Sequence, residues 1–139
     1  MGPLIVPGTL DSLSVIGKYI MDIAAKAGLD KKAAYRLRLA VDEIATNIVI
    51  HGYDEANRQG DLELRTELNE ADLTIFLEDT GASYTPGQFS DRTDLHLPLE
   101  ERQIGGLGVY LAMQGVDKFH YEHFEGRNRH TFVVNRTPT

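Results

Sequence analysis

The amino-acid sequence predicts an α+β fold, a two-layer sandwich with helices on one face of a mainly antiparallel sheet. Three observations predict it. Apolar residues recur with helical spacing over 12–27 and again over 31–51. The apolar pattern then changes to alternation over 62–68 and again over 73–78, and two further strand-like segments follow near the carboxyl end. Strands in adjacent pairs, with helices between the pairs, favour this two-layer arrangement.

The first two elements are predicted to be helices. Residues 12–27 carry an apolar stripe and are followed by Gly28, a residue suited to end a helix. The second helix is expected to begin after Asp30, a natural N-cap, and to run to His51. Gly52 is then expected to take the left-handed conformation that ends this helix.

The alternating segments are predicted to form a hairpin. Leucines and Thr66 alternate with charged residues over 62–68, and the pattern repeats over 73–78. Residues 69–72, Asn-Glu-Ala-Asp, are typical of a turn. Two antiparallel strands are therefore expected here.

The second half of the chain begins with a long loop. Residues 81–106 contain two prolines and four glycines, and loops of this length in a compact domain are usually functional lids or disordered. Residues 107–116 are predicted to be a helix. Residues 119–124 and 130–135 are predicted to be strands around a turn at 125–128.

Length and composition limit the classes of protein. The 139 residues suit one domain spanning 1–139, and the net charge of −7 argues against a nucleic-acid partner, which would need a clustered basic face. The chain has no cysteine, and the first residues lack the basic and apolar regions of a signal peptide. No apolar run approaches the ~20 residues that span a bilayer. We therefore expect a cytoplasmic protein with no membrane partner.

The first segment that carries chemistry is RLRLAVDEIATNIVIHGY, residues 36–53. On a helix, Glu43 and Asn47 lie one turn apart along the edge of the apolar stripe, where they could border a cleft. An asparagine oxygen is a neutral ligand for Mg²⁺, and a glutamate can accept a proton from a hydroxyl nucleophile. A solvated helix edge explains the same residues, and we interpret His51 as a helix-end residue rather than a base.

The second segment is TIFLEDTGASYTP, residues 74–86. A strand leads directly into Asp79, and Gly81 follows it. An aspartate there can accept a hydrogen bond from an exocyclic amine such as that of adenine, and a glycine lets backbone approach a flat ring. An ordinary Asp-x-Gly turn is the alternative interpretation.

The third segment is GGLGVYLAMQGVD, residues 105–117. Its glycines lie where a loop enters the predicted helix, so consecutive N–H groups and the helix dipole suit a phosphate. It is neither a Walker A loop nor a Rossmann fingerprint. A flexible hinge remains the alternative. Arg102, just before the glycines, could reach a phosphate or could serve only solubility.

Together and in this order, the three segments resemble the N, G1 and G2 boxes of the GHKL ATPase superfamily. The stretch AVDEIATNIVIHGY is the most specific, followed by IGGLGVYLAMQGVD and EDTGASYTP. Over nearly the whole chain the sequence is similar to the anti-sigma-factor serine kinase branch of that superfamily. The resemblance implies a Bergerat fold, with residues 82–104 as the ATP lid.

The resemblance also implies roles for particular residues. Glu43 matches the N-box glutamate proposed as general base, Asn47 the Mg²⁺-binding asparagine, and Asp79 the aspartate that recognises adenine. Thr131 matches the threonine that supports this aspartate, although Arg129 and His130 precede it where the family often has a glycine immediately before that threonine. The remaining matches are the glycine near the base and the phosphate-facing turn: Gly81, Gly105, Gly106, Leu107 and Gly108.

The function implied by the resemblance is a serine/threonine protein kinase that uses Mg²⁺ and ATP and acts as an anti-sigma factor. Its implied partners are a STAS-type anti-anti-sigma protein, which it phosphorylates, and a sigma factor; a homodimer is also implied. Two alternatives stay open. The chain could be a nucleotide-dependent module that sequesters a partner without catalysis, or a domain that has lost ATP, against which Glu43, Asn47 and Asp79 argue.

Overall fold

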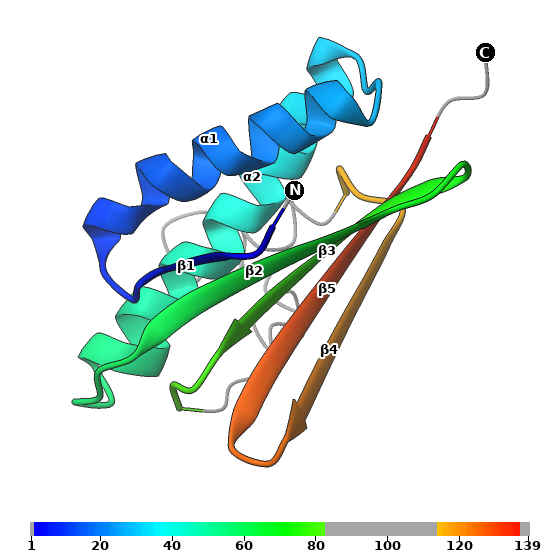
Figure 1. Cartoon of the computed structure of the whole chain (residues 1–139). Coiled ribbons are helices and arrows are strands. Elements are labelled where there is room, and N and C mark those ends of the chain that lie inside the picture. The colour runs from blue at the N-terminus through cyan, green and yellow to red at the C-terminus, as the bar shows by residue number, and fades with distance from the viewer. Residues whose placement is uncertain (1, 83–113, 137–139) are drawn as a thin grey trace, which may run out of the picture.

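A computed structural model describes residues 2–82 and 114–136 of the chain. Figure 1 shows two long helices packed against one face of a single sheet. The described elements, in chain order, are β1 (Leu4–Pro7), the 3-10 turn η1 (Leu10–Ser12), α1 (Leu13–Lys26), α2 (Lys31–Asn47), the π-helix η2 (Ile48–Asp54), β2 (Asp61–Leu68), β3 (Asp72–Asp79), β4 (Lys118–Phe124) and β5 (Arg127–Asn135).

The sheet has five strands in the order β1-β2-β3-β5-β4, and each neighbouring pair is antiparallel. The predicted α+β sandwich with helices on one face is therefore confirmed. Leu64 lies opposite Leu77, and Ile75 lies opposite Phe132, so that apolar side chains of adjacent strands meet on the face that α1 and α2 cover.

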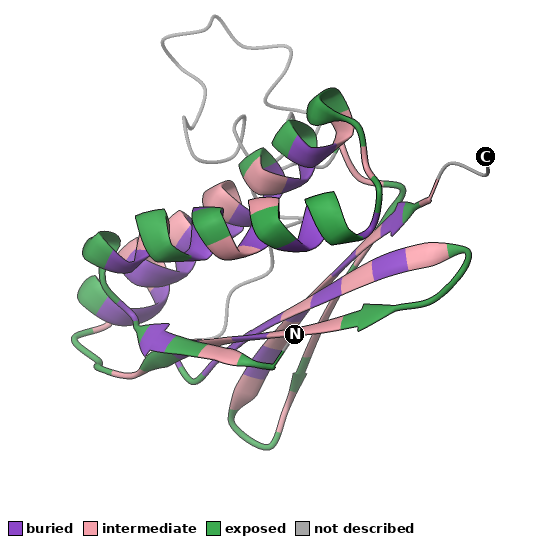
Figure 2. Ribbon diagram, turned by 45° about the horizontal axis from the view of Figure 1, so that its top comes forward, coloured by how far each residue is buried: buried purple, intermediate pink, exposed green. Residues whose placement is uncertain are grey.

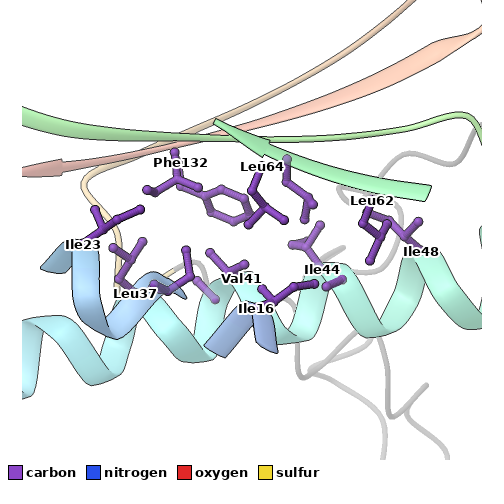
Figure 3. Close-up of a cluster of buried hydrophobic side chains, with 14 of the residues drawn as sticks. Ile16, Ile23, Leu37, Val41, Ile44, Ile48, Leu62, Leu64 and Phe132 are labelled. Carbon is purple, nitrogen blue, oxygen red and sulfur yellow. The ribbon is translucent and has the colours of Figure 1, made fainter. Parts of the chain in front are cut away.

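The core fills the space between the sheet and the two helices. Figure 2 shows buried positions along the inner sides of the helices and at alternate positions of the strands. Ile16 of α1, Leu37 and Ile44 of α2, and Leu64 and Phe132 of the sheet are almost completely buried, and they meet in one cluster (Figure 3). Burial of such side chains from both layers is the main contribution that holds the layers together.

Strand β1 is absent from the sequence-based prediction. Its four residues, Leu4–Pro7, are too short for a clear alternation, and Pro3 and Pro7 obscure it further. The strand pairs with β2 alone, at the edge of the sheet, where a proline is tolerated because no partner needs its missing N–H group. Val6 points inward and is buried.

The predicted helix boundaries are confirmed at three ends and wrong at one. Gly28 ends α1 with a φ of +78°, and the Asp30 side chain accepts a hydrogen bond of 2.7 Å from the backbone N–H of Ala33 at the start of α2. The second helix does not stop at His51 with a left-handed Gly52. It widens into the π-helix η2, and Asn57, with a φ of +57°, follows its end.

The two predicted carboxyl-terminal strands are present, but β5 begins earlier than expected. Glu125 and Gly126 have φ values of 50° and 76°, as in a two-residue turn of the kind that matches the twist of a hairpin. The turn is thus shorter than the predicted 125–128, and Asn128 belongs to β5.

Much of the predicted lid and of the predicted helix at 107–116 lies outside the described residues. The last positions of that predicted helix, 114–116, form a turn and bend before β4. Within the described ranges, none of the helices combines the length and the apolar character that a bilayer span requires.

Candidate functional site

Asp79 ends β3 with a buried and incompletely paired carboxylate. The residue is 2% exposed. Its Oδ1 accepts hydrogen bonds from the backbone N–H of Gly81 at 2.8 Å and from Asn128 Nδ2 at 2.9 Å. Its Oδ2 is buried and has no hydrogen-bond partner in the described part of the chain. A buried acceptor without a donor is costly, so this oxygen is suited to receive a donor from a ligand.

The electrostatic environment of Asp79 has two opposing contributions. Burial raises the pKa of its carboxyl group, because the charged form loses solvation. The hydrogen bonds from Asn128 and Gly81, and the positive charges of Arg127 and His123, lower the pKa, but they do not cancel the effect of burial. When this carboxyl group is ionised, the protein therefore compensates its charge only in part.

Gly81 brings the end of β3 against the helical layer. The backbone N–H of Ala82 donates to the carbonyl of Gly52 at 2.9 Å. A Cβ atom on Gly81 would lie 2.8 Å from the Gly52 carbonyl oxygen, closer than real Cβ contacts allow. A glycine at position 81 thus permits the close approach of two backbones, and the contact joins the strand end that carries Asp79 to η2.

Asn47 is the last residue of α2, and η2 begins at the next position. It is 4% exposed, and its Nδ2 is buried without a hydrogen-bond partner in the described ranges. Glu43 lies one helical turn earlier and is partly exposed. Burial raises the pKa of the Glu43 carboxyl group, and the neighbouring Asp42 carboxylate raises it further. A raised pKa favours a group that accepts a proton near neutral pH.

The structure brings four predicted site residues to one region. Glu43 and Asn47 share the carboxyl-terminal half of α2, and the contact between Gly52 and Gly81 connects this helical segment to Asp79. The arrangement can present a proton acceptor, an amide and a buried carboxylate to one ligand. Five predicted residues lie outside the described residues: Arg102, Gly105, Gly106, Leu107 and Gly108.

Thr131 does not support Asp79. It lies opposite Phe76 in the pairing of β3 with β5, on the sheet face away from the helices, whereas Asp79 faces the helical layer. Asn128 lies directly opposite Asp79 and makes the hydrogen bond that the sequence analysis expected from Thr131. The pairing of β3 with β5 causes the difference, because it places Asn128 beside Asp79 and Thr131 three positions away on the other face of the sheet.

Two cavities near this end of the sheet lie away from Glu43 and Asn47. The larger, of about 510 Å³, is lined by the β1–η1 connection and by residues after η2: Pro7, Gly8, Thr9, Asp54, Arg58, Gln59, Gly60 and Asp61. A second cavity, of about 260 Å³, reaches Asp79 and Thr80 but is otherwise lined by residues such as Glu63 and Arg127 from the outer sheet face. Neither contains the helical residues of the candidate site.

Comparison with known proteins identifies the class. The family profile described as "Histidine kinase-like ATPase domain" matches residues 6–134, and the chain belongs to this family. Solved structures agree on the fold. The histidine kinase domain of the blue-light-activated histidine kinase EL346 from Erythrobacter litoralis superimposes with a TM-score of 0.56 at 17% identity, covering 89% of this chain and 59% of that one. This chain thus spans less than two thirds of that structure.

Curated relatives are more similar in sequence. The serine-protein kinase RsbW of Halalkalibacterium halodurans is 29% identical over 116 residues, which are 81% of this chain and 70% of the relative. The serine-protein kinase RsbW of Bacillus mycoides is 27% identical over 124 residues, with 87% and 76% of the two chains covered. A second solved structure, the histidine kinase AdeS of Acinetobacter baumannii, superimposes with a TM-score of 0.54 at 13% identity. The superposition covers 97% of this chain and 68% of AdeS.

Proposed function

We propose that this chain is a cytoplasmic, ATP-dependent serine/threonine protein kinase that acts as an anti-sigma factor. Its substrate is a STAS-type anti-anti-sigma protein, and its second partner is a sigma factor. The family membership and the relatives named serine-protein kinase support the activity. The observation that carries the proposal is the buried Asp79 carboxylate, whose Oδ2 lacks a donor among the described residues. The glycine turn beside it packs on η2, the helical segment that follows Asn47.

The described residues fit an adenine nucleotide. Within the described ranges, Asp79 Oδ2 is a buried acceptor without a donor, as the exocyclic amine of adenine requires, and Gly81 has no side chain to block the approach. Asn47 is the described residue suited to Mg²⁺, because an amide oxygen is a hard, neutral ligand that can share the ion with phosphates. The proposed phosphate turn at 105–108 and the proposed lid at 82–104 complete a single ATPase domain.

The chemistry assigned to the chain's own residues is limited. Glu43 accepts the proton of the acceptor serine or threonine hydroxyl and aligns that oxygen. Its pKa, raised by burial and by Asp42, makes it a better acceptor than a solvated glutamate. Asp79 binds the adenine ring of the nucleotide, and Asn47 helps to position the phosphates. Bound Mg·ATP supplies the γ-phosphoryl group, whose bond to ADP breaks as the bond to the acceptor oxygen forms.

The test combines nucleotide binding with phosphoryl transfer. The purified chain is incubated with γ-labelled ATP, Mg²⁺ and a STAS protein from the same cell. We expect Glu43→Ala to bind ATP normally but to lose transfer by about 100-fold or more, the usual contribution of a general base. Glu70→Ala, in the exposed turn between β2 and β3, is the control, and it should retain the activity.

Other outcomes are equally informative. Unchanged transfer in Glu43→Ala contradicts the assignment of the base. A nucleotide-dependent complex with the STAS protein, with no phosphorylation by the wild-type chain, supports instead the sequestering module. Failure of the wild-type chain to bind ATP by calorimetry contradicts both.

A further inference from the structure

We propose that Asn128 is the positioning residue of the nucleotide site, and that Tyr121 and His123 hold its amide in the orientation that Asp79 requires. The inference rests on the proposed function, since it assigns a role within the same site. It names a residue that the sequence comparison with the GHKL boxes does not include.

Asn128 connects the Asp79 carboxylate to the glycine turn that follows it. It is 1% exposed and lies opposite Asp79 in the sheet. Its Nδ2 donates to Asp79 Oδ1 at 2.9 Å and to the carbonyl oxygen of Gly81 at 3.1 Å. One amide group thus fixes both the carboxylate and the glycine turn that follows it.

The orientation of the Asn128 amide is itself determined by its neighbours. Its Oδ1 accepts a hydrogen bond from the Tyr121 hydroxyl at 2.7 Å and lies 2.8 Å from His123 Nδ1. If the amide were reversed, its oxygen would face two acceptors, Asp79 Oδ1 and the Gly81 carbonyl. The observed orientation satisfies every contact, and it requires the proton of His123 to be on Nδ1.

The hydrogen bonds to Asp79 determine which of its two oxygens can accept a hydrogen bond from a ligand. Two donors occupy Asp79 Oδ1, so Oδ2 is the oxygen left to accept a ligand donor. A fixed carboxylate acceptor favours a purine with an amino group at the contact, as in ATP, over one with a carbonyl oxygen there, as in GTP. If Asn128 is removed, the carboxylate is free to rotate and loses one of its two donors.

Asn128 also maintains the ionised form of Asp79. Its hydrogen bond opposes the burial that raises the pKa of this carboxyl group. The other titratable or charged groups that act on or are affected by Asp79 are Tyr53 after α2, His123 in β4 and Arg127 in β5. Loss of Asn128 should therefore leave Asp79 protonated up to a higher pH, and a protonated oxygen is a poorer acceptor.

The test measures Mg·ATP and Mg·GTP binding by calorimetry over a range of mildly acidic to neutral pH. We expect Asn128→Leu to weaken ATP binding by about tenfold, the loss of one charge-assisted hydrogen bond, and to reduce the preference for ATP over GTP. The loss should grow as the pH falls. Tyr121→Phe, which keeps the amide but removes one of its fixed donors, should weaken binding by about threefold. Asn135→Leu, an exposed asparagine of the same strand, should bind as the wild type does.

Each result supports or overturns the inference. A folded Asn128→Leu variant with wild-type affinity at every pH overturns it. A loss that is the same at every pH and for both nucleotides also overturns it, because a general structural defect would act in that way. If Asn128→Leu does not fold, Tyr121→Phe decides, and unchanged affinity in that variant is the contrary result. If the wild-type chain binds ATP while these variants are unaffected, only the role of Asn128 fails. If the wild-type chain binds no nucleotide, the proposed function fails with it.

Discussion

Two adjacent carboxylates at the end of β3 have opposite environments. Glu78 and Asp79 are 5% and 2% exposed, and they point to opposite faces of the sheet. Glu78 lies on the face opposite α1 and α2, where its oxygens accept hydrogen bonds from Arg65 at 2.7 Å and Arg127 at 3.1 Å, and where Arg129 lies 3.4 Å away. Asp79 faces the helical layer, and among residues 2–82 and 114–136 it has two neutral donors on Oδ1 and none on Oδ2.

Because the two carboxylates have different partners, their pKa values shift in opposite directions although both groups are buried. For both groups burial is the largest single influence and raises the pKa. In Glu78 the hydrogen bonds from Arg65 and Arg127, together with the positive charges of Arg129 and Arg65, exceed it, so its pKa falls below the usual value. In Asp79 burial exceeds the neutral donors, and its pKa rises. A fully paired carboxylate stabilises the fold. An incompletely paired one costs stability and is retained where a ligand completes it.

The largest expected effect is on ligand binding at Asp79. Asp79→Asn replaces the charged acceptor, and we expect ATP affinity to fall by about 100-fold, as for the loss of a buried, charge-assisted hydrogen bond. The melting temperature without nucleotide should not fall, because the variant removes an uncompensated buried charge. Calorimetry and thermal unfolding measure the two effects, with Asp72→Asn at the other end of β3 as control. Unaltered ATP affinity would remove Asp79 from the site.

Substitution of Glu78 should lower the stability of the fold and leave nucleotide binding nearly unchanged. We expect Glu78→Gln to lower the free energy of unfolding by about 2 kcal/mol, since hydrogen bonds to charged groups are lost and three arginines remain close together. ATP affinity should change little. Urea unfolding measures the loss, and Glu67→Gln, on the exposed end of β2, provides the control. A fully stable Glu78→Gln variant would show that the arginine cluster contributes nothing to the fold.

The contrast between these carboxylates also shows what the sequence could predict. The fold class followed from apolar periods of 3.6 and 2, which depend on the core alone. Both helices and both hairpins were predicted, although α2 ends before His51 and β5 begins earlier than expected. Strand β1 was missed, because its four residues, the last of them Pro7, give no periodic signal. The π-helix was missed because its residues continue the helical pattern of α2 without interruption.

The site was predictable only in part, for a different reason. Glu43, Asn47, Asp79 and Gly81 lie in short segments whose local spacing is informative. The roles of Glu78 and Asn128 depend on pairing between β3 and β5, residues far apart in the chain. The final turn was predicted two residues too long, which left Asn128 in a loop, and the family resemblance implied the supporting role for Thr131 instead. The pairing register, which the sequence does not state, decides such roles.

A smaller effect is expected from the backbone contact beside Asp79. A Cβ on Gly81 would lie 2.8 Å from the Gly52 carbonyl oxygen, whereas a Cβ on Gly52 would meet its nearest atom at 3.6 Å, an ordinary contact. We expect Gly81→Ala to cost about 1.5 kcal/mol of unfolding free energy and to weaken ATP binding, and Gly52→Ala to be nearly neutral. Urea unfolding and calorimetry on the pair test this. Equal costs would contradict the close approach at Gly81.

The smallest expected effect, and the most direct test of the comparison, is the pH dependence of stability. Glu78 has a lowered pKa in the folded state, so its contribution to stability is present above the unfolded pKa and is lost as pH falls through the folded pKa. The stability difference between the wild type and Glu78→Gln should therefore shrink on acidification below about pH 4, near the unfolded pKa of glutamate. Asp79 has a raised pKa, so its charged form destabilises the fold as pH rises from the unfolded pKa through the folded one. Relative to the wild type, Asp79→Asn should gain stability over that rise. Urea unfolding of the wild type, Glu78→Gln and Asp79→Asn at a series of pH values measures both differences. If the stability of both variants relative to the wild type changed in the same direction with pH, the two carboxylates would not differ in the way their pairing requires.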